Sequence, residues 1–137
     1  MVSVAIALAL ATLLLFGGWA VAADVATRSL SAVNAVLLSY VASIGLVGGY
    51  AVLSRRPIAG TSTDIAFALG SGVFLAAGTL AFYAALTRGS MAVVSAIAGL
   101  YFVVPVLVGV AYFETALSTA NVVGFALAVV AVVLIAS

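Results

Sequence analysis

The residues that could carry acid–base or metal chemistry are few in this sequence. Its acids are Asp24, Asp64 and Glu114, and the chain has no Cys and no His. Long uncharged stretches separate the three acids, and each stands at the end of an apolar run, so no two are spaced as a catalytic pair. The usual zinc ligands are missing as well. We therefore expect no enzyme activity, no metal site and no cofactor.

Hydroxyl and aromatic side chains recur at helical spacing inside the apolar stretches. Three series are present: Ser39, Ser43 and Tyr50, with Tyr40 beside them; Gly72, Thr79 and Tyr83; and Tyr101, Pro105 and Tyr112. Such faces either bond to neighbouring helices or line one polar cavity, and the spacing leaves both alternatives open. The candidates for a solute path are Trp19, Tyr40, Ser43, Thr79, Tyr83, Tyr101 and Pro105.

Two of these candidates have a second interpretation. Pro105 lies well inside an apolar stretch and cannot donate to the carbonyl of Tyr101, which predicts a kinked helix with an unpaired carbonyl. Bent helices at membrane depth often build transport sites, although many are only packing kinks. Trp19 is either an anchor in the aromatic belt of the membrane interface or a residue at the mouth of the path.

Five apolar stretches must position these residues. Hydrophobic residues make up 68% of the 137-residue chain and charged residues only 5%, against about a quarter in soluble domains. Each stretch provides the roughly 20 residues needed to cross a bilayer: 2–23, 32–53, 65–86, 91–113 and 117–136. None contains Asp, Glu, Lys or Arg. We predict an all-α integral membrane protein, a bundle of five transmembrane helices in one domain over residues 1–137, located in the cell membrane.

The connections between the stretches carry helix-start and turn signals. No Lys or Arg precedes Arg28, so the first stretch is expected to be a retained helix and not a signal peptide. Residues 61–64 predict a turn followed by an N-cap, with Asp64 favourably placed against the helix dipole. The turns at 87–90 and 114–118 are very short, which predicts that consecutive helices pack as antiparallel neighbours.

Small residues in the last stretch indicate a helix contact. Without a hydrophobic drive in lipid, helices associate through close backbone approach. A general abundance of Ala and Gly would also place small residues on one face of this helix. The candidates for a dimer interface are Ala120, Gly124, Ala128 and Ala131.

The positive charges do not fix an orientation in the membrane. Five spans place Arg55 and Arg56 on one side and Arg28 and Arg88 on the other, so there is no positive-inside bias. Both orientations can then coexist, and two copies can meet as an antiparallel pair, although a parallel dimer stays open. A net charge of +1 gives no nucleic-acid footprint.

The second half of the sequence carries a series of short motifs in a characteristic order: Ala-Phe-Tyr-Ala-Ala-Leu at 81–86, Gly-Ser-Met-Ala at 89–92, Pro105, Glu114, and Asn-Val-Val-Gly at 121–124. In these motifs the sequence resembles the EamA repeat of the drug/metabolite transporter superfamily. The resemblance extends over nearly the whole chain. Residues 124–133 are also similar to the last-helix dimerisation motif of small multidrug exporters, with Ala131 at a position that is usually Gly. Those exporters use a carboxylate in the first helix, and no acid precedes Asp24 here, which disfavours their proton coupling.

The resemblance implies a transporter fold. Typical members have ten helices in two inverted five-helix repeats and export amino acids, metabolites or drugs, whereas this sequence resembles one repeat. It implies that Glu114 is a structural element at the end of the fourth helix, and that Pro105 and Gly124 match a proline and a glycine of the family.

Together these features predict a homodimer of ten helices that transports small neutral or zwitterionic metabolites, such as amino acids, by alternating access. A charge at mid-span costs about 3 kcal/mol or more, and no charged residue stands there. The alternative is a non-transporting membrane subunit or a component of a flippase for lipid-linked substrates. The expected partners are a small-molecule substrate, the lipid bilayer and a second copy of the chain. The substrate, the direction of transport and the coupling are not predicted.

Overall fold

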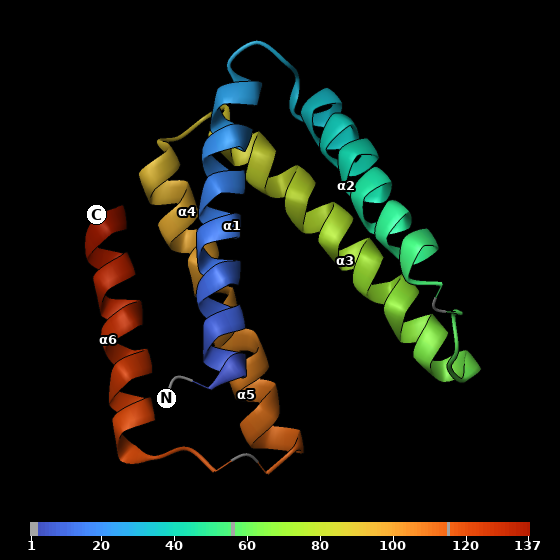
Figure 1. Cartoon of the computed structure of the whole chain (residues 1–137). Helices are drawn as coiled ribbons and strands as arrows, with labels where there is room; N and C mark the ends of the chain where they lie inside the picture. The colour runs from blue at the N-terminus through green and yellow to red at the C-terminus, as the bar shows by residue number, and fades with distance from the viewer. Residues whose placement is uncertain (1–2, 56, 115) are drawn as a thin grey trace. The chain divides into compact units, whose positions relative to one another are not determined.

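The computed structural model describes residues 3–55, 57–114 and 116–137, and these residues form helices and turns without a strand. The helices are α1 (Val4–Thr27), α2 (Ala32–Ser54), α3 (Ser62–Leu86), α4 (Met91–Gly99), the 3₁₀ helix η1 (Leu100–Phe102), α5 (Val103–Tyr112) and α6 (Thr119–Ala136) (Figure 1). With α4, η1 and α5 taken as one span, five segments are long and apolar enough to cross a membrane. The predicted all-α membrane class with five spans is confirmed.

Every span begins at a hydroxyl side chain that caps its first turn. Each of these caps accepts a hydrogen bond from the backbone N–H three residues further on, at 3.2–3.3 Å. The caps are Ser3, Ser31, Thr61, Ser90 and Ser118. A cap of this kind stabilises a helix by about 1 kcal/mol, so short local signals determine where the spans begin.

The cap of α3 is reciprocal and confirms the N-cap predicted at residues 61–64. The backbone N–H of Thr61 donates to the Asp64 carboxylate at 2.9 Å, while the Thr61 hydroxyl accepts from the Asp64 N–H. This pairing satisfies two N–H groups that the helix cannot satisfy itself. Because Thr61 is the cap, α3 starts at Ser62, three residues before the predicted start.

The first helix is longer than predicted. It continues past residue 23 to Thr27 because Asp24 pairs with Arg28 one turn later at 2.9 Å and the Thr27 hydroxyl donates to the carbonyl of Ala23. Asp24 therefore lies inside α1, and Asp64 inside α3, so the prediction that every span is free of charged residues is wrong for these two helices. The predicted start at Val2 lies outside the described residues.

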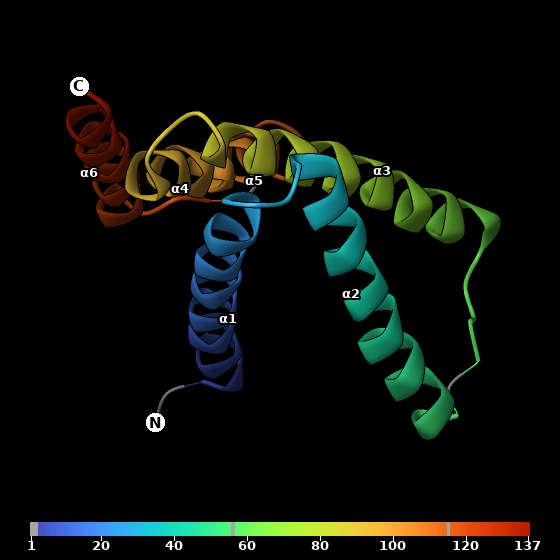
Figure 2. The ribbon, with the colours of Figure 1, turned by 90° about the horizontal axis from the view of Figure 1, so that it is seen from above.

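The chain forms two compact units, one ending at Arg88 and the other beginning at Gly89. In the first unit α1, α2 and α3 contact one another pairwise. Figures 1 and 2 show these helices meeting near the turn between α1 and α2 and diverging away from it. Among the described residues, the buried side chains all lie near that meeting point: Ala23, Ala35, Val36, Thr79, Tyr83 and Leu86.

In the second unit α6 packs against α4 and η1. The rings of Phe102 and Phe125 lie 5.6 Å apart across this contact. Most large apolar side chains of both units point outward, which suits a surface that faces lipid rather than water.

Candidate functional site

Four hydroxyl side chains join α2 to α3 near the meeting point of the first unit. The Tyr40 hydroxyl donates to Thr79 Oγ1 at 3.1 Å, and the hydroxyls of Ser39 and Tyr83 form a second bond at 2.8 Å. We call Ser39, Tyr40, Thr79 and Tyr83 the hydroxyl cluster. Residues about 40 positions apart in the sequence thus meet through two side-chain bonds between two membrane spans.

The hydroxyl cluster is enclosed by protein on its α3 side. Tyr83 is 2% exposed and Thr79 is 6% exposed, whereas Ser39 and Tyr40 are half-buried. Thr79 also donates to the carbonyl of Leu75 at 2.6 Å, which fixes its hydroxyl as the acceptor of the Tyr40 bond. A polar group buried in apolar surroundings without a partner is costly, so these bonds hold the two helices in one register.

Aromatic rings of α1 and α3 extend the hydroxyl cluster. The ring of Trp19 stacks on that of Phe82, with centroids 4.9 Å apart and planes inclined by 23°. It also lies 5.7 Å from the ring of Tyr83. Trp19 is 36% exposed, so one part of the indole packs on α3 and another part stays accessible, which leaves both interpretations of this residue open. The indole brings α1 to the same place where α2 meets α3.

The hydroxyl cluster keeps some hydrogen-bonding capacity. Each hydroxyl has one hydrogen and two lone pairs. Tyr40 and Thr79 use their hydrogens, but in the Ser39–Tyr83 pair only one hydrogen is used for the mutual bond. One donor and several acceptor lone pairs are left. A neutral polar group can use them, whereas none of these side chains carries a charge at neutral pH.

Ser43 lies one turn further along α2 and is exposed. Its hydroxyl donates to the carbonyl of Ser39 at 2.8 Å. It shares the face of the hydroxyl cluster without a bond to α3 among the described residues.

Tyr101 and Pro105 belong to the second unit. Tyr101 lies in η1 and is 67% exposed, and Pro105 lies in α5. The α-helix stops at Gly99 and resumes at Val103. The break therefore includes Tyr101, whose carbonyl would accept from the N–H that Pro105 lacks. The break lies where Pro105 was predicted to disturb the helix, but the Tyr101 carbonyl, which was predicted to be unpaired, accepts from the backbone N–H of Val103. The break lies about 15 Å from either end of the span, near the middle of a bilayer.

The small residues of α6 point mostly away from the rest of their unit. Ala120, Gly124 and Ala131 are exposed, whereas Ala128 is partly buried. A Cβ atom on Gly124 would have no neighbour within 4 Å. The part of this face around Gly124 is therefore open to the approach of another helix.

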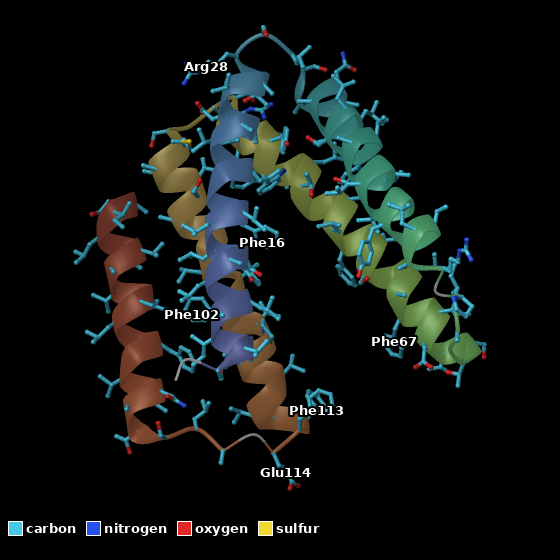
Figure 3. All side chains as sticks on the ribbon, viewed as in Figure 1. Phe16, Arg28, Phe67, Phe102, Phe113 and Glu114 are labelled. Atoms are coloured by element: carbon cyan, nitrogen blue, oxygen red, sulfur yellow. The ribbon has the colours of Figure 1, made fainter. Side chains whose placement is uncertain are left out.

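Glu114 follows Phe113, the C-cap residue of α5. Its backbone is left-handed, with φ of 50°, and its side chain is exposed (Figure 3). A left-handed residue at this position typically ends a helix. The geometry fits the structural role that the family resemblance implies for Glu114.

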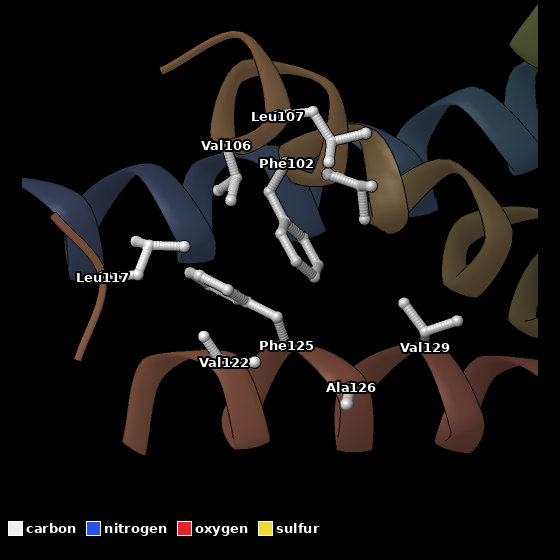
Figure 4. A pocket seen from close by; sticks show the side chains of 9 residues that line it. Phe102, Val106, Leu107, Leu117, Val122, Phe125, Ala126 and Val129 are labelled. Atoms are coloured by element: carbon white, nitrogen blue, oxygen red, sulfur yellow. The ribbon is translucent and has the colours of Figure 1, made fainter. Parts of the chain in front are cut away.

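An apolar groove runs between η1, α5 and α6 (Figure 4). It has a volume of about 230 Å³. Only apolar side chains line it: Phe102, Val103, Val106, Leu107, Leu117, Val122, Phe125, Ala126 and Val129. A groove of this composition suits a hydrocarbon chain and offers nothing to a polar solute.

Two contributors were not among the residues selected from the sequence. Ser39 was noted only as part of a polar stripe, and Phe82 only as part of a family pattern, although they hold Tyr83 and Trp19 respectively. The spacing of Ser39 and Ser43 is the signal that could have found the first. For Phe82 the only local signal is its position next to Tyr83.

The fold and the site define an all-helical, multi-pass membrane protein whose polar groups are gathered in otherwise apolar spans. Residues 3–137 match the model of the EamA-like transporter family. The chain therefore belongs to the EamA-like transporter family, which indicates a membrane transporter of the drug/metabolite superfamily and confirms the resemblance. No curated protein and no solved structure matches the chain.

Proposed function

We propose that the chain transports small neutral or zwitterionic solutes, such as amino acids, across the cell membrane as a homodimer by alternating access. The observation that carries this proposal is the hydroxyl cluster with its aromatic neighbour Trp19, set between membrane spans and uncharged. Hydroxyls and an aromatic face can replace part of the water around a small polar solute. They offer no fixed charge that would neutralise a solute with a net charge.

The proposal assigns no enzymatic reaction to the chain. Asp24 lies near the end of α1 and Asp64 at the start of α3, which places them on opposite sides of the membrane. Glu114 lies in the other unit. A reaction needs its acid and base within about 3 Å of the reacting atoms, and Asp24 and Asp64, at opposite ends of the first unit, do not form such a pair.

Two features support pairing with a second copy. The exposed small residues of α6 allow close approach of another helix. The described arginines Arg28 and Arg88 lie on one side and Arg55 on the other, and Arg56, outside the described residues, completes the balance. An even balance permits both orientations, and an antiparallel pair would supply inverted halves.

The test of transport uses the purified chain in liposomes with a panel of radiolabelled amino acids. We expect uptake of at least one solute, and we expect Thr79→Val and Tyr101→Phe to lower it by several-fold. Tyr50→Phe is the matched control, because Tyr50 is on α2, is 68% exposed and makes no hydrogen bond within the described residues. Well-folded protein without uptake of any solute in a broad panel contradicts the proposal.

Orientation can be tested separately because the chain contains no Cys. Single Cys residues at Ser54 and Ser137 are probed with a membrane-impermeant thiol reagent added from one side. An antiparallel dimer predicts about half labelling at either position. Complete or absent labelling of all chains contradicts it and leaves the parallel dimer.

The apolar groove favours a second candidate function, a non-transporting subunit or flippase component that handles a lipid-linked substrate. The groove accepts a hydrocarbon chain and carries no polar group. Translocation of a fluorescent lipid in proteoliposomes, measured by dithionite quenching, together with absent amino-acid uptake, would favour this candidate.

A further inference from the structure

The hydroxyl cluster lies nearer to one end of the three helices than to their middle. Tyr40 is about 12 Å along α2 from its start, and Thr79 is about 10 Å along α3 from its end. Trp19 is about 12 Å from the end of α1. The middles of these helices lie about 17–19 Å from their ends. All three helices therefore meet nearer to the end that carries Arg28 and Arg88.

This end of the first unit is closed and the opposite end is open. Every buried side chain of the unit lies near the meeting point of the three helices. Away from it the helices diverge (Figures 1 and 2). The large apolar residues of these parts are exposed. Glycines on the diverging parts, such as Gly48 and Gly70, would have no neighbour within 4 Å of an added Cβ atom. The polar bonds between helices are confined to the closed end among the described residues.

We propose that the Ser39–Tyr83 and Tyr40–Thr79 bonds, capped by Trp19 on Phe82, form a gate that closes the solute path on the Arg28 and Arg88 side. This inference rests on the proposed transport function and assigns the hydroxyl cluster to closure of an entrance rather than to a central binding site. Ser39 and Phe82 are the new residues in this assignment. Ser39 holds Tyr83 across the gate, and Phe82 holds Trp19.

The bonding pattern suits a contact that opens and closes. Hydrogen bonds between membrane helices are individually weak on average, so two of them hold a closed state without making it permanent. Opening exposes four hydroxyls, and water or the passing solute can then form hydrogen bonds with them in place of the bonds between the helices. A contact made only of apolar side chains would have no such replacement.

An antiparallel pair would hold the gate twice, once near each membrane face. Alternating access then requires only that one copy of the gate opens while the other stays closed. An off-centre cluster is what this arrangement needs, because a central one would close both entrances together.

The test measures distances between spin labels at Val33→Cys on α2 and Thr87→Cys at the end of α3. Both positions are exposed and uncharged, so the charge balance is unchanged. Labelled chains are diluted with unlabelled chains in liposomes of phosphatidylethanolamine and phosphatidylglycerol. We expect two distance populations, with the ratio of long to short rising about threefold in Tyr83→Phe and up to about tenfold in Tyr40→Phe/Tyr83→Phe. Tyr50→Phe should leave it unchanged.

A covalent lock distinguishes a gate from a static contact. The same two Cys residues are joined with a reducible bifunctional thiol reagent, and uptake of radiolabelled glycine and serine is measured before and after reduction. A gate predicts loss of uptake in the locked protein and its return on reduction. A locked protein that transports at the unlocked rate overturns the gate, as does a single distance population that is the same in all variants. Absent uptake in the unlocked protein contradicts the proposed transport instead, and the distances still decide whether the contact opens.

Discussion

Replacing Tyr83 by Phe removes one hydroxyl and keeps the ring in place. The hydroxyl bonds to Ser39 at 2.8 Å, and the residue is 2% exposed. Hydrogen bonds between membrane helices contribute about 0.6 kcal/mol on average and at most about 1.7 kcal/mol. The Ser39 hydroxyl that loses its partner can bond within its own helix, as Ser43 does with the carbonyl of Ser39. We therefore expect Tyr83→Phe to lower the free energy of unfolding by about 0.5–1.5 kcal/mol.

Replacing Tyr83 by Ala should cost considerably more. The ring contacts Trp19 and lies beside Phe82, and removal of a buried aromatic side chain costs about 3–5 kcal/mol in soluble cores. Each aromatic pair adds about 0.5–1.5 kcal/mol to such packing. The ring, not the hydroxyl, then supplies most of the stability, while the hydroxyl determines the register of α3 on α2.

The assay is reversible unfolding in lipid bicelles, with a double-mutant cycle of Tyr83→Phe and Ser39→Ala. The two changes should be non-additive, with a coupling of about 0.6 kcal/mol. Tyr50→Phe, on the exposed face of α2, should change stability by less than about 0.5 kcal/mol. Additive effects of the two substitutions would refute the reasoning, because they would mean that the Ser39–Tyr83 bond contributes nothing to the fold.

Three further changes test other parts of the structure. Pro105→Ala supplies an N–H for the carbonyl of Tyr101, so the amides around η1 should gain protection from hydrogen exchange. Unchanged protection would mean that the proline does not cause the break. Thr61→Val removes the cap of α3 and should lower stability by about 1 kcal/mol in thermal unfolding, whereas an equal loss in the control Thr63→Val would contradict the capping argument. Gly124→Leu should leave the single chain folded, because the added side chain meets open space. It should weaken dimerisation, measured by energy transfer in liposomes. Unaltered dimerisation, or equal weakening by the control Val123→Leu, would exclude this face as the contact.

Much of the fold could be predicted because the relevant information is local. A run of about 20 apolar residues has few alternatives to a membrane helix, and Ser or Thr before such a run caps it. The effect of Pro105 was also predictable, because the missing N–H acts on a carbonyl four residues away. The end of α1 was not, because Asp24 looked like a terminating charge, whereas its pairing with Arg28 one turn later carries the helix onward.

The hydroxyl cluster could be predicted only in part. Periodicity places Ser39 and Tyr40 on adjacent positions of one helix and Thr79 and Tyr83 on one face of another. It cannot say which residue of α2 meets which residue of α3, since that register depends on a turn of several residues and on packing with α1. The stacking of Trp19 on Phe82 has the same origin: two aromatic residues far apart in sequence become neighbours only when three helices converge.

The concentration of polar contacts at one end has a consequence for the rest of the first unit. Apolar helices in lipid slide past one another at little cost, because lipid tails replace helix contacts almost equally well. Hydroxyl pairs have directional geometry and cannot slide in this way, so they fix α2 on α3 where they occur and leave the diverging parts unconstrained. Those parts carry the exposed glycines Gly45, Gly48, Gly49 and Gly72, which allow close approach of another helix. One end of the unit is therefore determined by its own side chains, and the other end depends on what packs against it, so pairing and the position of the diverging helices should change together.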